Sequence, residues 1–364
     1  MNPFNPSFGR VPPIFLDREK MLGEIRKGLD NINSPYQTCL ICGQRGTGKT
    51  AFLTDISSSV QKDSSWIVAD LPATGELLQI LIQSIYRQTT DDVQKAPGAI
   101  HGVKISVLGE QAEYQRNENL QLNYQTLLEA VLERLKEKHI KLLITIDEVS
   151  ATKEIREFAS VYQIMIRKGY HVTLLMTGLP RNISELQNDN ILTFLLRSAR
   201  IELGTLDLIS VKESYRETFN NNGWNAEDKV LTMMAARTAG YAYAFQLLGY
   251  LIWDTEEYTV TEATLEKVYG EYRRQLYRNV YTKIYDDLSN TDREFVKAVA
   301  EDENTEVARK DIEARMHKST AYVSNYRKRL IDSQIIMVST WGYVKFTLPY
   351  FKEYVNDRIA FESV

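Results

Sequence analysis

The stretch TCLICGQRGTGKTAFL, residues 38–53, decides how this chain folds. Its apolar start predicts a buried strand, and the residues from Lys49 onward predict a helix. Between them, GQRGTGKT fits the pattern G-x-x-x-x-G-K-[ST] at Gly43, Gly48, Lys49 and Thr50. A strand, a glycine-rich turn and a helix in this order bring backbone N–H groups and a helix N-terminus together around phosphate oxygens. The segment therefore predicts a nucleotide-binding P-loop.

Each part of this loop has an expected role in holding ATP and Mg²⁺. Gly46 and Gly48 let the backbone approach the ligand, Lys49 neutralises the β- and γ-phosphates, and the Thr50 hydroxyl binds Mg²⁺. The predicted nucleotide-binding residues are Gly43, Gln44, Arg45, Gly46, Thr47, Gly48, Lys49, Thr50 and Ala51. The predicted cofactors are accordingly ATP and Mg²⁺.

A second motif lies about a hundred residues further on, in the apolar segment LLITIDE at 142–148. On one interpretation, its two acids merely cap a strand. The preceding P-loop favours another, in which Asp147 holds Mg²⁺ through its water shell and Glu148 orients or deprotonates an attacking water. A phosphotransfer kinase would not need the second carboxylate for a water molecule. The pair therefore favours hydrolysis of the nucleotide.

The order of apolar runs and helical patterns predicts an α/β fold with a doubly wound parallel sheet. Further strands are expected at WIVADL (66–71) and VTLLMTG (172–178), with an amphipathic helix before the latter. We expect an N-terminal linker and helix at 1–36, a P-loop ATPase core at 37–204, a helical lid subdomain at 205–288 and a winged-helix domain at 289–364. The stretch 72–139 suggests no function.

The last of these units is predicted from three short helices followed by two alternating segments. The helical patterns are TDREFVKAVA, RKDIEARM and STAYVSNYRKRLI, and the segments IIMVST and YVKFTL are joined through Trp341 and Gly342. Two helices that meet at a short turn and precede a β-hairpin are typical of a winged helix-turn-helix.

A binding face for duplex DNA is expected on the helix STAYVSNYRKRLI. Residues 289–364 contain twelve basic and twelve acidic residues, so the unit is not a general polyanion binder. Its basic residues are clustered, however, and helical spacing buries Val323, Tyr326 and Leu330 while turning Ala321, Ser324, Asn325 and Lys328 outward. The predicted DNA contacts are Lys318, Ser324, Asn325, Arg327 and Lys328, with Arg329 nearby. The alternative is a face that packs on a protein partner or a neighbouring subunit.

The composition is that of a globular protein rather than of a membrane-spanning one. Hydrophobic residues make up 43% of the 364 and charged residues 25%, which is ordinary globular composition, and no apolar run is long enough to cross a bilayer. The N-terminus lacks the pattern of a signal peptide, so we expect a soluble, cytoplasmic protein without membrane contact. The net charge of −4 supplies no overall attraction to nucleic acid. Cys39 and Cys42 are expected to pack rather than bind metal, since no second cysteine pair accompanies them.

Taken together, the two motifs and the order of elements resemble an AAA+ ATPase of the origin-recognition and STAND-like clade with a C-terminal winged helix. The resemblance implies a homo-oligomer in which Arg197, with Arg200 next best, serves as an arginine finger. It also implies that Thr177, at the end of the fourth strand, is a polar sensor residue, and that Phe15 and Arg18 lie beside the adenine.

One position departs from this family pattern. A sensor-2 arginine is expected shortly after a glycine in AGYAYAFQ, yet Tyr243 stands there. A Gly-Tyr-x-Tyr helix resembles the STAND group of signalling ATPases, which use nucleotide as a switch. Two functions follow: an ATPase that couples nucleotide state to oligomerisation and DNA binding, or a STAND-like switch whose winged helix contacts protein. DNA-stimulated turnover would favour the first, and tight nucleotide retention without DNA affinity the second.

Overall fold

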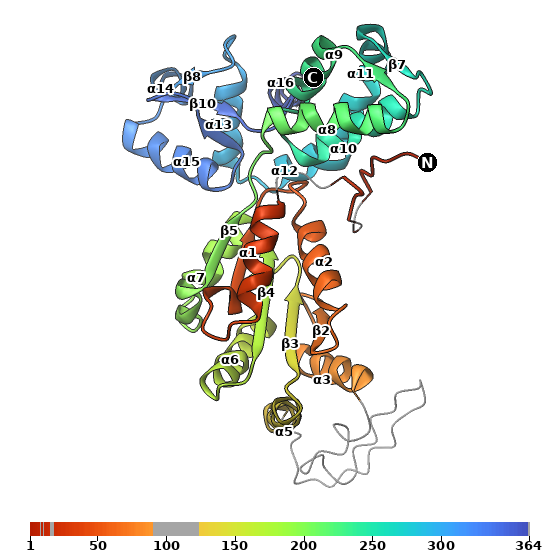
Figure 1. Ribbon diagram of the computed structural model, residues 1–364. Coiled ribbons are helices and arrows are strands. Elements are labelled where there is room, and N and C mark those ends of the chain that lie inside the picture. Colours follow the sequence, from red (N-terminus) through yellow and green to blue (C-terminus); the bar gives the residue numbers. More distant parts are fainter. Residues whose placement is uncertain (8, 10, 15–17, 90–123, 363–364) are drawn as a thin grey trace.

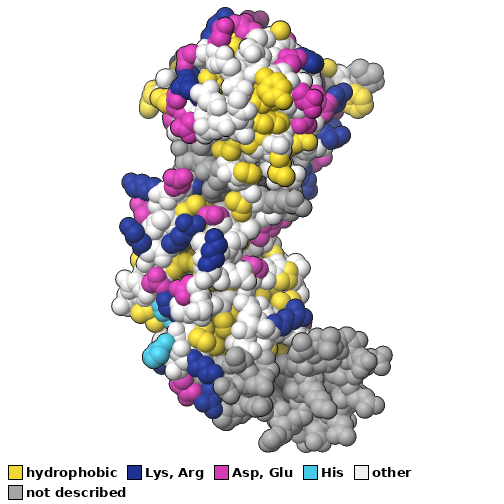
Figure 2. All heavy atoms as spheres, turned by 45° about the vertical axis from the view of Figure 1, so that its right-hand side comes forward, with side chains coloured by type: hydrophobic (Ala, Val, Ile, Leu, Met, Phe, Trp, Pro, Cys, Tyr) yellow, Lys and Arg dark blue, Asp and Glu magenta, His cyan; other side chains and the backbone are white. Residues whose placement is uncertain are grey.

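The computed structural model of the chain describes residues 1–7, 9, 11–14, 18–89 and 124–362. A layer built around a β-sheet occupies the lower half of Figure 1, and a helical region and a C-terminal unit lie side by side above it. Basic and acidic side chains are interspersed over the face shown in Figure 2. Among the helices in the described ranges, none is long and apolar enough to span a membrane.

The sheet has five parallel strands in the order β2-β3-β4-β1-β5. Its strands are β1 (Thr38–Cys42), β2 (Trp66–Leu71), β3 (Lys141–Ile146), β4 (Val172–Gly178) and β5 (Ala199–Glu202). The four strands expected from the sequence are present, and the prediction of a doubly wound parallel α/β fold is confirmed. The edge strand β5 was not expected, because it is four residues long and only Ile201 within it is buried.

Helices cover both faces of the sheet. Packed on one face are the η1 turn (Pro35–Gln37), α1 (Glu19–Leu29) and α2 (Lys49–Val60); on the other lie α3 (Leu77–Gln88), α5 (Tyr124–Glu137), α6 (Lys153–Arg167) and α7 (Pro180–Gln187). Cys39 and Cys42, which we expected to pack, are both buried in β1. Because side chains alternate between the two faces of a strand, Cys39 belongs to the core on the first face and Cys42 to the core on the second. The carboxyl ends of β1, β3 and β4 meet at one edge, where an open α/β sheet usually binds its ligand.

The helical region follows β5. Its elements are α8 (Leu208–Asn221), β6 (Asn225–Ala226), α9 (Asp228–Thr238), α10 (Ala242–Trp253), β7 (Thr259–Val260), α11 (Glu262–Leu276), a π-helical turn η3 (Tyr277–Tyr281) and α12 (Thr282–Asp286). Ala239 and Gly240 separate α9 from α10 with φ angles of 48° and 73°. A side chain at Gly240 would place its Cβ 2.3 Å from the Leu206 carbonyl oxygen, so this close turn requires glycine. The turn sets Tyr241 and Tyr243 at the beginning of α10.

The C-terminal unit combines helices with a small antiparallel sheet of order β8-β10-β9. It consists of α13 (Asn290–Ala300), β8 (Val307–Ala308), α14 (Arg309–Met316), α15 (Thr320–Asp332), β9 (Ile336–Val338), β10 (Tyr343–Phe346) and α16 (Phe351–Glu362). The three expected helices and the two expected strands are present. Neither β8 nor α16 was expected. The first is only two residues long, and the second mixes apolar with charged residues without a strong helical period.

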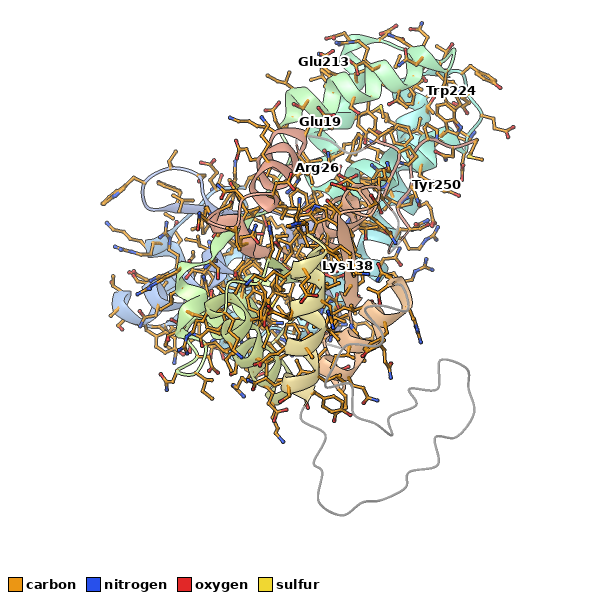
Figure 3. The ribbon with its side chains drawn as sticks, turned by 60° about the horizontal axis from the view of Figure 1, so that its bottom comes forward. Glu19, Arg26, Lys138, Glu213, Trp224 and Tyr250 are labelled. Carbon is orange, nitrogen blue, oxygen red and sulfur yellow. The ribbon has the colours of Figure 1, made fainter. Side chains whose placement is uncertain are left out.

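The N-terminal segment docks on the helical region. Phe4 is 1% exposed and packs edge-on against Phe245, with their ring centroids 5.8 Å apart. A Cβ at Gly249 would lie 2.5 Å from the Phe4 ring, so the missing side chain in α10 makes the notch that receives Phe4. Asn2 donates a hydrogen bond of 3.1 Å to the carbonyl oxygen of Tyr250, which is labelled in Figure 3.

We predict that Phe4→Ala destabilises the helical region. Truncating a buried phenylalanine costs about 3–5 kcal/mol, since both apolar burial and packing contacts are lost. Scanning calorimetry should therefore show a lower melting temperature for Phe4→Ala than for the wild type. Phe361→Ala is the matched control because Phe361 is 80% exposed, and its melting temperature should not change. Equal melting temperatures for the two variants would contradict the docking of the N-terminal segment.

Candidate functional site

The P-loop connects β1 to α2 and encloses the end of a buried lysine side chain. Gly46 and Gly48 have φ angles of 76° and 88°, in the left-handed region that glycine adopts without strain. Lys49 is the first residue of α2, is 8% exposed, and donates a hydrogen bond of 3.0 Å from Nζ to the Gln44 carbonyl oxygen. Burial lowers the pKa of Lys49 to about 8, although the carboxylates of Asp147 and Glu148 oppose that shift. The structure therefore holds a buried amine inside a loop of backbone groups.

The carboxyl ends of β3 and β4 bring the predicted polar residues to this loop. Thr50 donates from Oγ1 to Asp147 Oδ2 at 2.6 Å, and Thr177 donates from Oγ1 to Asp147 Oδ1. The Asp147 carboxylate is therefore held between two threonine hydroxyls. A hydroxyl and a carboxylate are oxygen ligands of the kind that Mg²⁺ prefers, so the residues present fit the ion.

Glu148 adopts an unusual backbone conformation beside this carboxylate. Its φ angle is 55°, and its N–H donates to Asp147 Oδ1 at 3.0 Å and to Thr177 Oγ1 at 3.3 Å. A left-handed non-glycine residue costs of order 1–3 kcal/mol and is found preferentially at functional sites. The side chain is exposed and lines the same cavity as Lys49 and Thr50. The structure thus brings Lys49, Thr50, Asp147, Glu148 and Thr177 together.

The cavity in front of the P-loop has a volume of about 430 Å³ and is built from four parts of the chain. The N-terminal segment contributes residues between Asn5 and Ile14, and the sheet layer contributes the P-loop and Glu148. Residues of α10 and η3, together with Arg18 and Leu206, also line the cavity. Gln246 of α10 holds the N-terminal segment in place. Its side chain accepts a hydrogen bond from the Asn5 N–H at 2.9 Å and donates one to the Ile14 carbonyl oxygen at 2.8 Å.

Arg18 lines this cavity, and its guanidinium donates hydrogen bonds to backbone carbonyl oxygens of the P-loop and of the segment after β5. It is 5% exposed and donates from Nη2 to the carbonyl oxygens of Thr47 at 3.3 Å and Gly204 at 3.2 Å. Phe15, the other residue expected beside the adenine, lies outside the described residues.

Two tyrosines of the α9–α10 turn fasten the helical region to the P-loop. Tyr241 donates from its hydroxyl to the Arg45 carbonyl oxygen at 2.6 Å, and the Tyr243 N–H donates to the Gly46 carbonyl oxygen at 3.0 Å. The second of these contacts is between backbone groups and fixes where α10 begins relative to the loop. Asn279 of η3 donates to the Tyr243 hydroxyl at 2.8 Å, and burial raises the pKa of that hydroxyl. The sequence did not predict these contacts, because segments so far apart leave no local pattern.

The predicted arginine finger does not reach this cavity. Arg197 ends the η2 turn (Thr193–Arg197), is exposed, and is not among the residues that line the cavity. Arg200 lies on β5, where it pairs with Glu202 at 3.1 Å and donates to Gln187 at 3.1 Å. An exposed Arg197 away from its own cavity is compatible with a role toward a neighbouring subunit, which stays a prediction.

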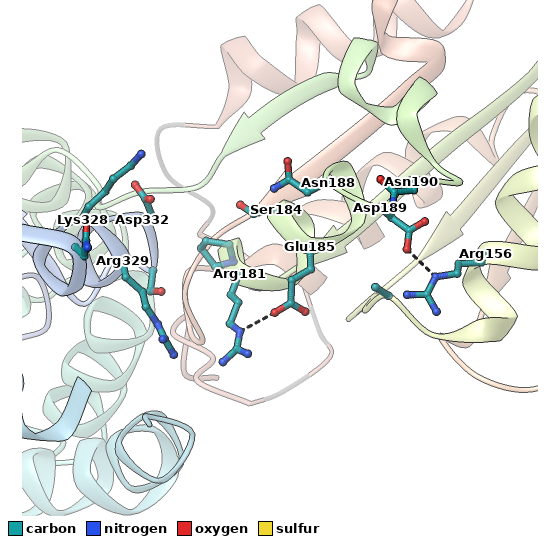
Figure 4. Close-up of a pocket in the computed structure, with 14 residues that line it drawn as sticks. Arg156, Arg181, Ser184, Glu185, Asn188, Asp189, Asn190, Lys328, Arg329 and Asp332 are labelled. Atoms are coloured by element: carbon teal, nitrogen blue, oxygen red, sulfur yellow. Dashed lines mark hydrogen bonds and ion pairs between the residues drawn. The ribbon is translucent and has the colours of Figure 1, made fainter. Parts of the chain in front are cut away.

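Helix α15 has the expected buried and outward faces in part, since Tyr326 and Ser324 are each half-buried. Val323 and Leu330 are buried and Tyr326 is half-buried, while Ala321, Asn325 and Lys328 are exposed. Asn325 and Lys328 line a cleft of about 880 Å³ between α15 and α7, which Figure 4 shows in close-up.

The other predicted DNA contacts differ in their surroundings. Ser324 and Arg327 are half-buried, and Lys318 is exposed with its Nζ 5.5 Å from the centre of the Tyr322 ring. Arg329 instead pairs at 2.8 Å with Asp292, which is 4% exposed at its side chain, so this arginine ties α15 to α13.

Two family models match parts of the chain. A family described as an AAA domain matches residues 32–187, and a family described as a domain of unknown function (DUF8462) matches residues 278–355. No curated protein matches the sequence.

Solved structures share the fold at low sequence identity. The Walker-type ATPase PABY2304 of Pyrococcus abyssi is 14% identical with a TM-score of 0.64, and the match covers 96% of this chain and 97% of that one. The ADP form of the Aeropyrum pernix ORC2 protein is 14% identical with a TM-score of 0.51, covering 98% and 97%. The segment that carries the P-loop thus matches the AAA domain family, and the chain is an ATPase built on a doubly wound parallel sheet.

Proposed function

We propose that the chain hydrolyses ATP with Mg²⁺ in the cavity of about 430 Å³, and that its nucleotide state controls oligomerisation and DNA binding through a C-terminal winged helix. The observation that carries the catalytic part is the convergence of Lys49, Thr50, Asp147 and Glu148 at the carboxyl edge of the sheet. The similar fold of the Aeropyrum pernix ORC2 protein, which was solved as an ADP form, supports nucleotide binding by this chain.

Each residue of the site has a proposed role. Thr50 and Asp147 would hold Mg²⁺, which when bound neutralises charge on the phosphates. Lys49 would exchange its hydrogen bond to the Gln44 carbonyl oxygen for one to a phosphate. Glu148 would accept a proton from the attacking water, since its carboxylate is exposed at the cavity. Thr177 would keep the Asp147 carboxylate in place.

The proposal of DNA binding rests on the arrangement of the C-terminal unit. Helices α14 and α15 meet at residues 317–319, where His317 has a φ of 52° and the Ser319 side chain accepts a hydrogen bond from the Tyr322 N–H. The strands β9 and β10 that follow would form the wing. We propose that α15 enters the major groove, with Ser324 and Asn325 toward the bases.

A STAND-like switch is the second candidate, and Tyr243 is the observation that favours it. At the place of a sensor-2 arginine, this residue bonds to Gly46 through its backbone and to Asn279 through its hydroxyl. A neutral, already bonded side chain offers no mobile cation to the γ-phosphate. On this alternative, nucleotide would be retained tightly and the C-terminal unit would bind protein.

The first prediction from this proposed function separates binding from hydrolysis with two variants. Lys49→Ala removes the cation that compensates the phosphates, so ATP affinity should fall by roughly tenfold or more. Glu148→Gln keeps the shape of the side chain but removes the proton acceptor, so ATP should still bind while the turnover falls by roughly 10²-fold or more. Calorimetric titration and a phosphate-release assay measure the two effects. Wild-type turnover in Glu148→Gln would contradict the role given to this carboxylate.

The second prediction concerns Arg197, which we propose acts on the nucleotide of a neighbouring subunit. Specific activity should then rise with protein concentration. A mixture of Arg197→Ala and Lys49→Ala proteins should recover hydrolysis, because mixed oligomers contain an intact P-loop facing an intact Arg197. Arg181→Ala is the matched control, since Arg181 is another exposed arginine of the sheet layer, and it should keep wild-type activity alone. No recovery at concentrations where mixed oligomers form would indicate a site completed within one chain.

The third prediction concerns the salt dependence of duplex DNA binding by the C-terminal unit. Three or four phosphate contacts from Lys318, Arg327 and Lys328 and their neighbours should give a slope on the order of −3 in log K against log salt for duplex DNA. The double variant Arg327→Ala, Lys328→Ala should reduce the slope by roughly two units. Lys62→Ala with Lys153→Ala, two exposed lysines of the sheet layer, should leave it unchanged. If the ATP-bound protein does not bind duplex DNA at low salt, the proposal of DNA binding is wrong, and the alternative that the C-terminal unit binds a protein partner replaces it.

A further inference from the structure

The C-terminal unit reaches the P-loop at Gln44. The Gln44 N–H donates to Gln334 Oε1 at 3.0 Å, and the Gln44 side chain donates from Nε2 to the Ser333 carbonyl oxygen at 2.8 Å. These partners follow α15 directly, and Gln334 lies 290 residues from Gln44 in the sequence. Gln44 is 8% exposed, and its two partners are half-buried, so both hydrogen bonds are partly shielded from water.

The same glutamine is also the partner of Lys49. Its carbonyl oxygen accepts hydrogen bonds from Lys49 Nζ at 3.0 Å and from Thr47 Oγ1 at 2.8 Å. Gln44 is therefore held on its N–H side by the C-terminal unit and on its carbonyl side by the P-loop lysine. A ligand that draws Lys49 away removes a charged hydrogen bond from the residue on which the C-terminal unit docks.

Gln334 is held firmly in the conformation that makes this contact. Its φ angle is 56°, and its N–H donates to the Ile331 carbonyl oxygen at 2.8 Å. Its own carbonyl oxygen accepts a hydrogen bond of 2.6 Å from Thr347 Oγ1. A strained backbone that neighbouring contacts keep in place is a feature of functional positions, and here it presents the amide to the P-loop.

The surroundings of the contact are incompletely packed. A cavity of about 210 Å³ lies between Gln44, Tyr241 and Gln334, and α15 is separated from α7 by the cleft of about 880 Å³. Figure 4 shows Lys328 and Asp332 of α15 across this cleft from α7. Because close packing is what makes an interface permanent, this one is suited to opening.

We propose that Gln334 is a positioning residue of the nucleotide site, which fastens the C-terminal unit to Gln44 when the P-loop is empty. Binding of the phosphates draws Lys49 from the Gln44 carbonyl oxygen and releases the unit. Once the C-terminal unit is released, α15 no longer faces α7, and its outward face becomes accessible to duplex DNA. This inference rests on the proposed nucleotide site. By thermodynamic linkage, nucleotide binding weakens the docking of the C-terminal unit, and docking of the unit weakens nucleotide binding to the same extent.

Calorimetric titration of the full-length chain with ADP and Mg²⁺ tests the proposal. Gln334→Met has the same length but no carbonyl acceptor, so it should bind ADP roughly two- to tenfold more tightly, the range expected for the loss of one hydrogen bond that opposes binding. Gln334→Glu keeps the acceptor and should not gain affinity. A residue that only stabilises the fold would not increase affinity when altered, so equal or weaker binding by Gln334→Met overturns the proposal.

A distance measurement tests the proposal first with Gln334 intact and then in the Gln334→Met variant. Cysteines introduced at the exposed positions Lys153 of α6 and Lys310 of α14 would carry the spin labels. The distance between the labels reports how the C-terminal unit sits relative to the sheet layer. The native cysteines are buried and should not be labelled. ADP with Mg²⁺ should produce a second distance population, and Gln334→Met should show it without nucleotide. If ADP binds but the distance does not change, the proposed release of the C-terminal unit is wrong while the nucleotide site stands. If ADP does not bind at all, the proposed nucleotide site is wrong as well.

Discussion

The structure depends on how the backbone carbonyl groups of the P-loop are satisfied. The Gln44 carbonyl oxygen accepts hydrogen bonds from within the loop, whereas the carbonyl oxygens of Arg45, Gly46 and Thr47 take donors from other parts of the chain. Here Lys49 donates to Gln44, Tyr241 to Arg45, the Tyr243 N–H to Gly46 and Arg18 to Thr47. These donors come from α2, from the beginning of α10 and from the segment before α1. The loop is thus the point at which separate parts of the chain are held together.

This arrangement explains why the nucleotide cavity includes residues from distant parts of the chain. Phe4 anchors the N-terminal segment in α10, and Gln246 of the same helix holds that segment beside the cavity. The beginning of α10 in turn contacts the loop through Tyr241 and Tyr243. Short, direct contacts therefore connect the loop to the helical region and, through Gln44, to the C-terminal unit.

Much of the sheet layer could be predicted from the sequence because its signals are local. Four strands, the P-loop and the pair Asp147 and Glu148 follow from apolar runs that end in polar or glycine-rich turns. The strand β5 could not be predicted, since four residues with one buried side chain carry too little pattern. The break between α9 and α10 was also missed, because the need for Gly240 arises from the Leu206 carbonyl oxygen, which comes close only in the folded chain. In the candidate site, the motif residues could be named, whereas Tyr241, Gln246 and Gln334 act through contacts between distant segments.

A crystal structure of the chain with ADP and Mg²⁺ tests the central claim most directly, which is that residues 43–50 bind the phosphates and that Gln44 links them to the C-terminal unit. The account predicts phosphate oxygens at the N-terminus of α2, Lys49 Nζ bonded to them rather than to the Gln44 carbonyl oxygen, and Gln334 separated from Gln44. Nucleotide bound elsewhere would contradict the site itself. Phosphates in the P-loop with both Gln44 hydrogen bonds to Ser333 and Gln334 intact would contradict the link.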